Sequence, residues 1–252
     1  MKRLSRNRPN IISNNVKRSR MRNRPFGGRH LIFYNNLESI KKQANNFDKP
    51  IDLSNKSIEL VIACDDKMEL SVLSLLNCIA RVKFSTIKFF TSKVDDKSLD
   101  IIRDKVQIIK IKPLNSVQDY SKFITLNLVN YVEKDFTLLV QHDGTIIYQD
   151  MWTDEFLNYD YIGAPWSKDA LNTFDVFKRI DDRMIKDFPK YAVGNGGFCI
   201  RSKKLMDCVA NYKNFSEILS KFVYSEDVVI CSHMEVREYL ESNGIKFAPY
   251  EL

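Results

Sequence analysis

Glycine is scarce in this sequence, with eight residues among 252, and three of the eight fall within four positions: Gly194, Gly196 and Gly197. They belong to the stretch VGNGGFCIRS, residues 193–202. Ordered glycine is costly and is used where the backbone needs a positive φ or approaches another group closely. The stretch therefore predicts either a floor for a polar ligand beside Asn195 and Arg201 or a tight turn that enters a short strand.

Paired cysteines are also lacking, because no two of the five cysteines have the Cys-x-x-Cys spacing. This absence disfavours a zinc site. Most of the cysteines lie in apolar or helical surroundings, so we expect reduced, buried thiols in a cytoplasmic protein. The five are Cys64, Cys78, Cys199, Cys208 and Cys231.

Long apolar runs are missing as well. No stretch approaches the roughly 18 apolar residues of a transmembrane helix, and the start MKRLSRNRPN lacks the apolar segment of a secretory signal. The length and the hydrophobic fraction of 44% are sufficient for one sizeable domain with a full core.

Acidic residues are absent from residues 1–30, which carry ten lysines or arginines. The net charge of the whole chain is +7, so the rest of the chain is slightly acidic. A basic segment with few apolar residues is expected to be disordered. We expect it either to bind nucleic acid or another polyanion or to act as a solubilising extension.

A regular alternation of strand and helix patterns begins at Ile58 and runs to Gln141. It predicts an α/β fold with a mainly parallel central sheet. The pattern predicts strands at 58–64, 86–90, 106–111 and 136–141, with helices at 68–79, 95–105 and 119–132. Further along the chain it predicts a strand at 161–166, an irregular loop over the site at 167–191, helices from 203 and from 225, and a last short strand at 244–252.

A polar cluster follows the apolar run FTLLV, residues 136–140, at once. Ligands of α/β sheets lie beyond the carboxyl ends of parallel strands, where Gln141, His142 and Asp143 would emerge. A carboxylate there is a suitable ligand for Mg²⁺ or Mn²⁺ on a diphosphate. The alternative interpretation is a solvated turn.

The segment Ser225-Glu226-Asp227 has the composition of a helix start, a cap followed by acids in the first turn. That structural role is sufficient by itself to explain both acids. The functional interpretation makes one of them a general base at the mouth of a pocket. Adjacent helix positions point about 100° apart, so at most one would face a reacting group.

Together these stretches resemble a family of glycosyltransferase-like domains of mostly uncharacterised members. The resemblance covers residues 58–252. Its motifs are Q-x-D after an apolar strand, then a Trp, DYIGAPW, VGNGGFSLRS, ED and GIKFAP. The matching residues are Gln141 with Asp143, Trp152, Asp160 to Trp166, Val193 to Ser202, Glu226 with Asp227, and Gly244 to Pro249.

The resemblance implies the glycosyltransferase A fold, a Rossmann-like α/β sandwich that binds a nucleotide sugar. In that superfamily a D-x-D motif holds a divalent metal, Mn²⁺ or Mg²⁺, on the diphosphate. Here Gln141 replaces the first acid and only Asp143 matches the metal-binding end, so the expected metal site has fewer carboxylate ligands than usual. The family continues past its A-P motif whereas this chain stops at Leu252, and a later ligand or lid is expected to be missing.

Roles for the remaining site residues follow from the resemblance. We expect Asp227 to be the general base, in a motif that resembles the x-E-D of inverting relatives, and Glu226 to orient it or bind the sugar. Gly196 and Gly197 would let a sugar approach the backbone, and Trp166 would either stack on a sugar or pack in the core. The other expected donor contacts are Ala63, Cys64, Asp65, Gln141, Asn195 and Arg201.

The predicted organisation is a basic tail at 1–30, a lead-in segment at 31–57 and a glycosyltransferase-like domain at 58–252, short at its C-terminus. The predicted function is metal-assisted, inverting transfer of a sugar from a nucleotide-sugar donor to an unidentified acceptor. The alternative is a catalytically inactive scaffold whose tail binds nucleic acid or another polyanion. The absence of glycine from ACDDKMEL, residues 63–70, disfavours a nucleotidyltransferase.

Overall fold

The computed structural model describes residues 50–169, 186–221 and 225–252. The predicted basic tail at 1–30 and most of the predicted lead-in at 31–57 lie outside these ranges, as does much of the predicted loop at 167–191. Within the described ranges, no helix is both long enough and apolar enough to cross a membrane.

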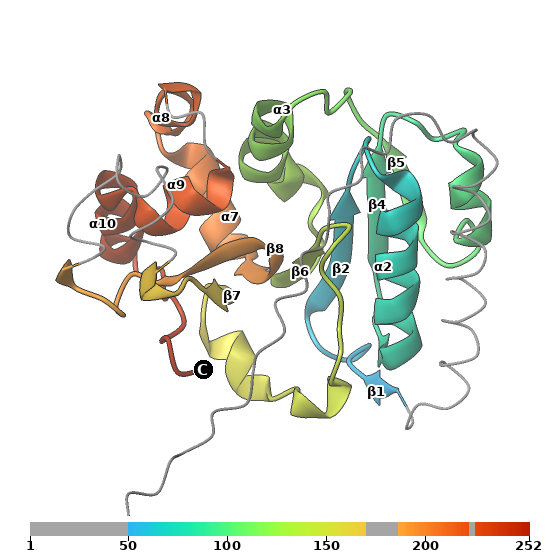
Figure 1. The fold of residues 1–252 in the computed structure, drawn as a ribbon, viewed down its shortest axis with the longest axis horizontal. Helices are drawn as coiled ribbons and strands as arrows, with labels where there is room; N and C mark the ends of the chain where they lie inside the picture. The colour runs from blue at the N-terminus through green and yellow to red at the C-terminus, as the bar shows by residue number, and fades with distance from the viewer. Residues whose placement is uncertain (1–49, 170–185, 222–224) are drawn as a thin grey trace, which may run out of the picture.

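A six-stranded sheet forms the centre of the described chain (Figure 1). Four neighbouring strands are parallel, and the fifth is antiparallel to both of its neighbours, which confirms the mixed α/β architecture with a mostly parallel sheet. The order is β5 (Gln107–Lys110), β4 (Ile87–Thr91), β2 (Ile58–Ala63), β6 (Phe136–Val140), β8 (Val193–Ser202) and β7 (Tyr161–Pro165). Two short strands, β1 (Ile51–Asp52) and β3 (Val82–Lys83), form a separate parallel pair.

The neighbouring strands β2 and β6 lie in the middle of the sheet. All six residues of β2 and four of the five in β6 are buried, as their nearly continuous apolar sequences predict for parallel strands covered on both faces. Val61 is level with Leu139, so the two strands end at the same edge. The residues that follow Ala63 and Val140 therefore emerge next to each other.

Helices cover both faces of the sheet, because alternate residues of each strand point to opposite faces. On one face, Ile58, Leu60 and Ile62 share a core with α2 (Met68–Arg81) and η1 (Lys97–Ile101). On the other face, Val61 and Ala63 share a core with η2 (Phe123–Asn127), α7 (Lys203–Asn211), α8 (Phe215–Lys221), α9 (Glu226–Ser232) and α10 (Met234–Ser242). The remaining segments are α3 (Val117–Lys122), η3 (Leu128–Tyr131), η4 (Gln149–Met151) and η5 (Asp154–Asn158).

Two of the predicted helices are shorter or less regular than expected. The segment 95–105 forms only the 3₁₀ helix η1, because the Asp96 side chain accepts from Ser98 N–H and its carbonyl accepts from Leu99 N–H three residues on. The segment 119–132 divides into α3, the π-helical η2 and the 3₁₀ helix η3. Neither local hydrogen-bond pattern is visible in hydrophobic spacing.

The prediction that the glycine-rich stretch forms a tight turn before a short strand is wrong, because Val193–Ser202 is one ten-residue strand, β8. Among the described glycines only Gly244 has a positive φ, at 73°. The pairing of β8 with β7 loses its register on both sides of Ala164. The three glycines of β8 therefore serve close approach and not a reversal of the chain.

The C-terminal part of the chain also departs from expectation. His233, with φ −77° and ψ 108°, separates α9 from α10, so the predicted single helix is two helices. Residues 244–252 do not form the predicted strand. They make a single parallel β-bridge, which joins Phe247 to Tyr161. Lys246 N–H donates to the side chain of Asp160 at 2.8 Å, and Pro249 has no N–H to offer a ladder.

Candidate functional site

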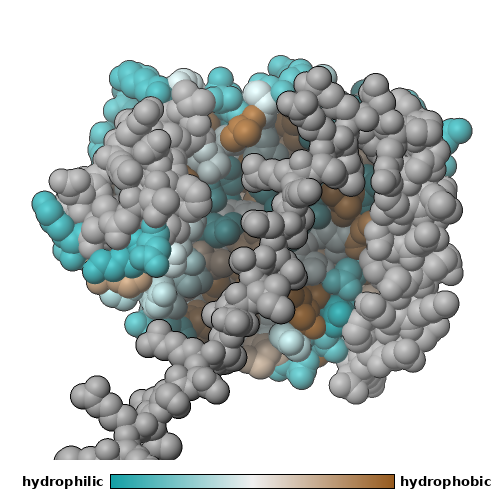
Figure 2. All heavy atoms as spheres, in the orientation of Figure 1, coloured by the Kyte–Doolittle hydropathy of each residue, from teal (hydrophilic) through white to brown (hydrophobic). Residues whose placement is uncertain are grey.

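Two cavities open at the edge where β2 and β6 end, and we call them the first and the second cavity. The first cavity has a volume of about 530 Å³ and is lined by residues 63–67, Ser71, residues 114–117, Tyr120, Gln141, His142, Ser225 and Glu226. The second has about 550 Å³ and is lined by Gln141, Asp143, Gly144, Phe156, residues 162–165, Asn195, residues 197–200 and Leu252. Gln141 lines both, so the cavities adjoin at the end of β6. In the view of Figure 2, apolar residues show near the middle of the molecule, with hydrophilic residues around them.

Asp65 is 7% exposed and forms part of the wall of the first cavity. Its carboxylate accepts hydrogen bonds from the Thr91 hydroxyl at 2.7 Å, from Ser92 N–H at 2.7 Å and from Leu114 N–H at 2.6 Å. Burial raises the pKa of the Asp65 carboxyl, but these hydrogen bonds outweigh burial and leave the pKa below its ordinary value. Asp65 thus joins the ends of β2 and β4 to the loop after β5 and fixes the shape of the cavity.

Ala63 and Cys64 lie beside Asp65 at the end of β2 and also line the first cavity. Ala63 is buried and Cys64 is half-buried. Burial raises the pKa of the Cys64 thiol to about 12, so this group stays protonated near neutral pH. The pair offers a neutral surface to a ligand and no nucleophile.

Three side-chain oxygens converge on the open side of Gly197, and we call them the oxygen triad. A β-carbon on Gly197 would lie 3.4 Å from Gln141 Oε1, 3.4 Å from Asn195 Oδ1 and 3.9 Å from Asp143 Oδ1. Asp143 is the one carboxylate of the three, and its side chain is 69% exposed. Within the described ranges, no group of three or more His, Cys, Asp or Glu side chains is placed to hold a metal. The triad instead combines one carboxylate with two amide oxygens.

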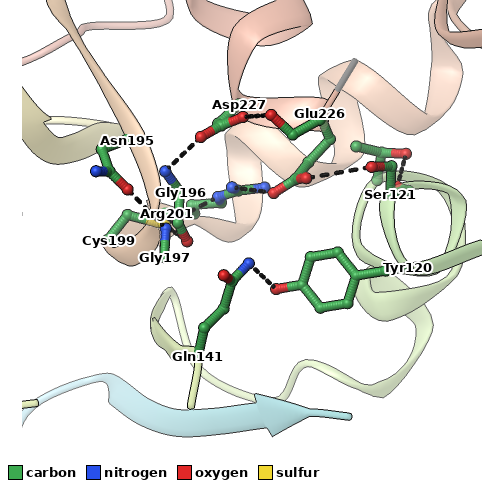
Figure 3. A network of polar contacts seen from close by, with 12 residues as sticks. Tyr120, Ser121, Gln141, Asn195, Gly196, Gly197, Cys199, Arg201, Glu226 and Asp227 are labelled. Atoms are coloured by element: carbon green, nitrogen blue, oxygen red, sulfur yellow. Dashed lines mark hydrogen bonds and ion pairs between the residues drawn. The ribbon is translucent and has the colours of Figure 1, made fainter. Parts of the chain in front are cut away.

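Two neighbouring groups orient the amides of the triad (Figure 3). Gln141 Nε2 donates to the Tyr120 hydroxyl at 3.0 Å, which leaves Gln141 Oε1 on the side of Gly197. Gly197 N–H donates to Asn195 Oδ1 at 3.1 Å. Both amide oxygens are therefore held in place from the protein side.

Arg201 and Glu226 form a buried ion pair behind the site, with Arg201 Nη2 at 2.8 Å from Glu226 Oε1 (Figure 3). Arg201 is 2% exposed and Glu226 1% exposed, and the Ser121 hydroxyl donates to Glu226 Oε2 at 3.3 Å. Burial and the nearby Asp227 carboxylate raise the pKa of Glu226, and Arg201 offsets this only in part. Arg201 lines neither cavity, so the structure places it against Glu226.

Asp227 lies beside this pair but is only half-buried. Its Oδ2 accepts from Gly196 N–H at 2.7 Å, and its Oδ1 accepts from Val228 N–H at 2.8 Å and from the Ser225 hydroxyl. The carboxylate therefore joins the start of α9 to the middle of β8 (Figure 3).

The glycines of β8 admit these neighbours. A β-carbon on Gly196 would lie 2.9 Å from Arg201 Nη2 and 2.9 Å from Asp227 Cβ. A β-carbon on Gly194 would lie 2.0 Å from Trp166 Cη2, because the indole ring packs directly on that glycine. Trp166 is half-buried and packs against the core, which agrees with the core alternative and leaves part of the ring exposed.

Sequence reasoning missed three residues of the site: Tyr120, Ser121 and Lys67. Tyr120 and Ser121 lie in a segment that reads as an ordinary helix, and their partners Gln141 and Glu226 are distant in sequence. Lys67 follows Asp65 by two positions, so the strand-end argument that selected Asp65 could have reached it.

The comparisons with known proteins give one family and a distant structural neighbour. The model of the family described as "Protein of unknown function (DUF5672)" matches residues 103–251. No curated protein matches the sequence. Among solved structures, mannosyltransferase PcManGT from Pyrobaculum calidifontis, in complex with GDP-Man and Mn²⁺, is similar with a TM-score of 0.41 and 9% sequence identity. That similarity covers 88% of this chain, which spans 62% of the neighbour's length.

Proposed function

This chain belongs to the family described as "Protein of unknown function (DUF5672)", and from that premise we propose a function on the geometry of its own site. The function is transfer of a sugar from a nucleotide-sugar donor to an acceptor hydroxyl. One observation carries the proposal: the two cavities adjoin at the oxygen triad, beyond the ends of two parallel strands. A nucleotide sugar has the same division, with a nucleoside and a sugar on either side of a diphosphate.

The sizes of the cavities support this assignment. Each has a volume within the roughly 300–1,000 Å³ of typical ligand pockets. The nucleoside would occupy the first cavity, against Ala63, Cys64 and the fixed carboxylate of Asp65. The sugar would lie in the second cavity over Gly197. Trp166 packs on Gly194 and lines neither cavity, so this proposal gives it no stacking role.

The oxygen triad suits a divalent cation, because Mg²⁺ and Mn²⁺ prefer carboxylate and carbonyl oxygen ligands. Asp143, Gln141 and Asn195 would hold it. A bound cation would supply Lewis-acid neutralisation of the departing diphosphate. Since only Asp143 of the three carries a charge, we expect weak binding of the cation in the absence of nucleotide.

Asp227 is the candidate general base of this proposal. Glu226 is paired with Arg201 and is almost fully buried, whereas Asp227 is half-buried. Asp227 accepts three hydrogen bonds of its own and lines neither cavity, so an acceptor would approach it from outside the two cavities. An acceptor hydroxyl would have to reach hydrogen-bond distance of this carboxylate. Glu226 then orients the start of α9, with Arg201 as its counter-ion. Direct displacement with an external base implies inversion at the anomeric carbon.

The variant Asp143→Asn tests the role of the oxygen triad. The amide keeps the size of the side chain but removes the one charge of the triad, so Mn²⁺ should no longer strengthen nucleotide-sugar binding. Thermal shifts with and without Mn²⁺, over a panel of nucleotide sugars, measure this effect. The variant should keep the melting temperature of the wild type in the absence of ligand, because the side chain is largely exposed. Unchanged Mn²⁺-dependent binding in Asp143→Asn would contradict the proposal.

A further inference from the structure

Lys67 has an unusual backbone at the edge of the first cavity. Its φ of 53° and ψ of 39° are left-handed, and among the described residues it is the one non-glycine residue with a positive φ. Its N–H donates to Asp66 Oδ1 at 2.9 Å, and its carbonyl accepts from Ser71 N–H at 3.0 Å. Strained conformations of this kind persist where the surroundings hold them and are concentrated at ligand sites.

Lys67 also supplies a positive charge to the site. Among the described residues that line the two cavities, it is the one lysine or arginine. Its Nζ lies 2.9 Å from His142 Nε2, which places the ammonium group next to the end of β6 and the oxygen triad. An imidazole does not cancel the ammonium charge as a carboxylate would.

The carboxylates around Lys67 differ in how they are engaged. Asp65 accepts three hydrogen bonds from its own surroundings, and Glu226 is paired with Arg201. Asp143 is exposed, and its Oδ2 lies 3.7 Å from His142 Nε2, the atom that Lys67 Nζ contacts. Asp66, which accepts from Lys67 N–H, also lines the first cavity. An anion at the junction of the cavities would have Lys67 as its cationic partner among these side chains.

We propose that Lys67 binds the diphosphate of the donor, with His142 as the side chain that positions its ammonium group. This inference rests on the proposed function, because it assigns a second partner to the same leaving group. When the bond between the sugar C1 and the phosphate oxygen breaks, its electron pair stays on that oxygen. The acceptor oxygen bonds to C1, and its proton passes to Asp227. The nucleoside diphosphate thus gains one negative charge, which the Lys67 ammonium group stabilises.

Binding measured without metal isolates this contact. The 252-residue chain is titrated in EDTA with UDP, GDP and ADP and, separately, with uridine, guanosine and adenosine, by isothermal calorimetry. Lys67→Met removes the charge while keeping a long side chain and the same backbone requirement, and Lys67→Arg keeps the charge. Lys83→Met is the matched control, because Lys83 is an exposed lysine of β3 that lines neither cavity.

For the diphosphate that the wild type binds, we expect Lys67→Met to weaken affinity about ten- to hundred-fold, the range of a hydrogen bond to a charged group. Lys67→Arg should retain most of the diphosphate affinity, and Lys83→Met should retain all of it. The affinity for the nucleoside should be the same in every variant. The wild-type affinity should also fall more steeply with salt than that of Lys67→Met.

Two results would overturn the inference while leaving the proposed function in place. They are equal diphosphate affinity in Lys67→Met and the wild type, or an equal loss in Lys67→Met and Lys67→Arg. If the folded wild type binds no nucleoside diphosphate, with or without Mn²⁺, the proposed function itself fails and the inference fails with it.

Discussion

Four of the carboxylates around the candidate site are each engaged differently. Asp65 is buried and saturated by hydrogen bonds, Glu226 is buried in an ion pair, Asp227 is half-buried against a backbone N–H, and Asp143 is exposed. Asp143 and Asp227 are at least partly exposed, whereas Asp65 and Glu226 are buried, and Asp227 is the one of the four that lines neither cavity. Asp143 and Asp227 are the two that we expect to act on substrate, while Asp65 and Glu226 hold the walls.

Replacement of the candidate base should affect turnover more than binding. Asp227→Asn can still accept a hydrogen bond from Gly196 N–H, so the start of α9 should stay in place. Loss of a positioned proton acceptor typically lowers turnover by about 10²–10⁴-fold. Donor affinity should change little, because the diphosphate contacts lie at other residues. Steady-state kinetics with an identified acceptor measure both quantities.

The anomeric configuration of the product provides the decisive control for Asp227. Inversion is expected, and a retained configuration would contradict the role of Asp227 as a base. Nearly full activity in Asp227→Asn, with a loss of only about 0.3–1 kcal/mol in stability, would reduce Asp227 to a helix-start residue.

Asp65 should make stability depend on pH in the acid range. Its folded pKa is lower than the value of about 3.9 in an unfolded chain, so it contributes stability above that value and loses the contribution as pH falls through the folded pKa. Asp65→Asn should therefore be less stable than the wild type near pH 7, and the difference should shrink in acid. Urea denaturation from pH 7 down to pH 3 measures it, with the exposed Asp95→Asn as control. A difference that does not change with pH would contradict this assignment.

Strand β8 is the element that brings the site together. Trp166 packs on Gly194. Arg201 and Asp227 lie against Gly196, and the oxygen triad lies next to Gly197. The Arg201–Glu226 pair then fixes α9 against the same strand. Each glycine thus has a different neighbour, and substitutions along one strand should separate stability from binding.

Gly194→Ala and Gly197→Ala form a matched pair on β8. The new methyl group at 194 would overlap the Trp166 ring, so the free energy of unfolding should fall by about 1–3 kcal/mol, the usual cost of overpacking. At 197 the new methyl group meets its neighbours at 3.4 Å or more, so stability should be kept while Mn²⁺-dependent nucleotide binding weakens. Chemical denaturation and thermal shifts measure the two effects. Equal behaviour of the two variants would contradict the close-approach account of β8.

Elements with strong local patterns could be predicted from the sequence. The apolar runs IELVIA and FTLLV predicted β2 and β6, and helical spacing predicted α2. The glycines of β8 were expected to serve a turn or a close approach, and only the structure distinguishes the two, because the neighbours of Gly194 and Gly196 come from other parts of the chain. The break between α9 and α10 at His233 depends on one ψ angle, and no glycine or proline marks it in the sequence.

The candidate site was accessible from sequence only in part. Asp65 and Asp143 could be selected because residues at strand ends meet at one edge of the sheet. Tyr120 and Ser121, which bind Gln141 and Glu226, could not be selected from the sequence. Contacts between residues that are distant in sequence produce no periodic pattern. Arg201 stood out beside the glycines, but it is buried against Glu226 and lines neither cavity.

At the scale of the whole molecule, two cores lie on opposite faces of one sheet, and the candidate site lies at the edge that both cores support. The basic segment at 1–30 precedes all the described strands. Its positive charge predicts salt-sensitive contact with polyanions, separate from sugar transfer.

Removal of residues 1–45 should therefore leave the fold and nucleotide-sugar binding unchanged. Binding to duplex DNA, RNA or heparin at low salt should be lost in the shortened chain, because twelve lysines and arginines are removed. Circular dichroism, thermal shifts and a salt titration measure these properties. A shortened chain that stays folded but no longer binds nucleotide sugars would place part of this segment in the site.

Sugar transfer itself is the most direct test of the account. The folded 252-residue chain is incubated with Mn²⁺ and a panel of isotope-labelled nucleotide sugars, with candidate acceptors and with water alone. Mass spectrometry follows the labelled sugar and the released nucleoside diphosphate. We predict that one donor yields nucleoside diphosphate together with transferred or hydrolysed sugar, and that Asp143→Asn forms neither. If the folded protein neither binds nor turns over any nucleotide sugar, with or without Mn²⁺, the proposed function is contradicted.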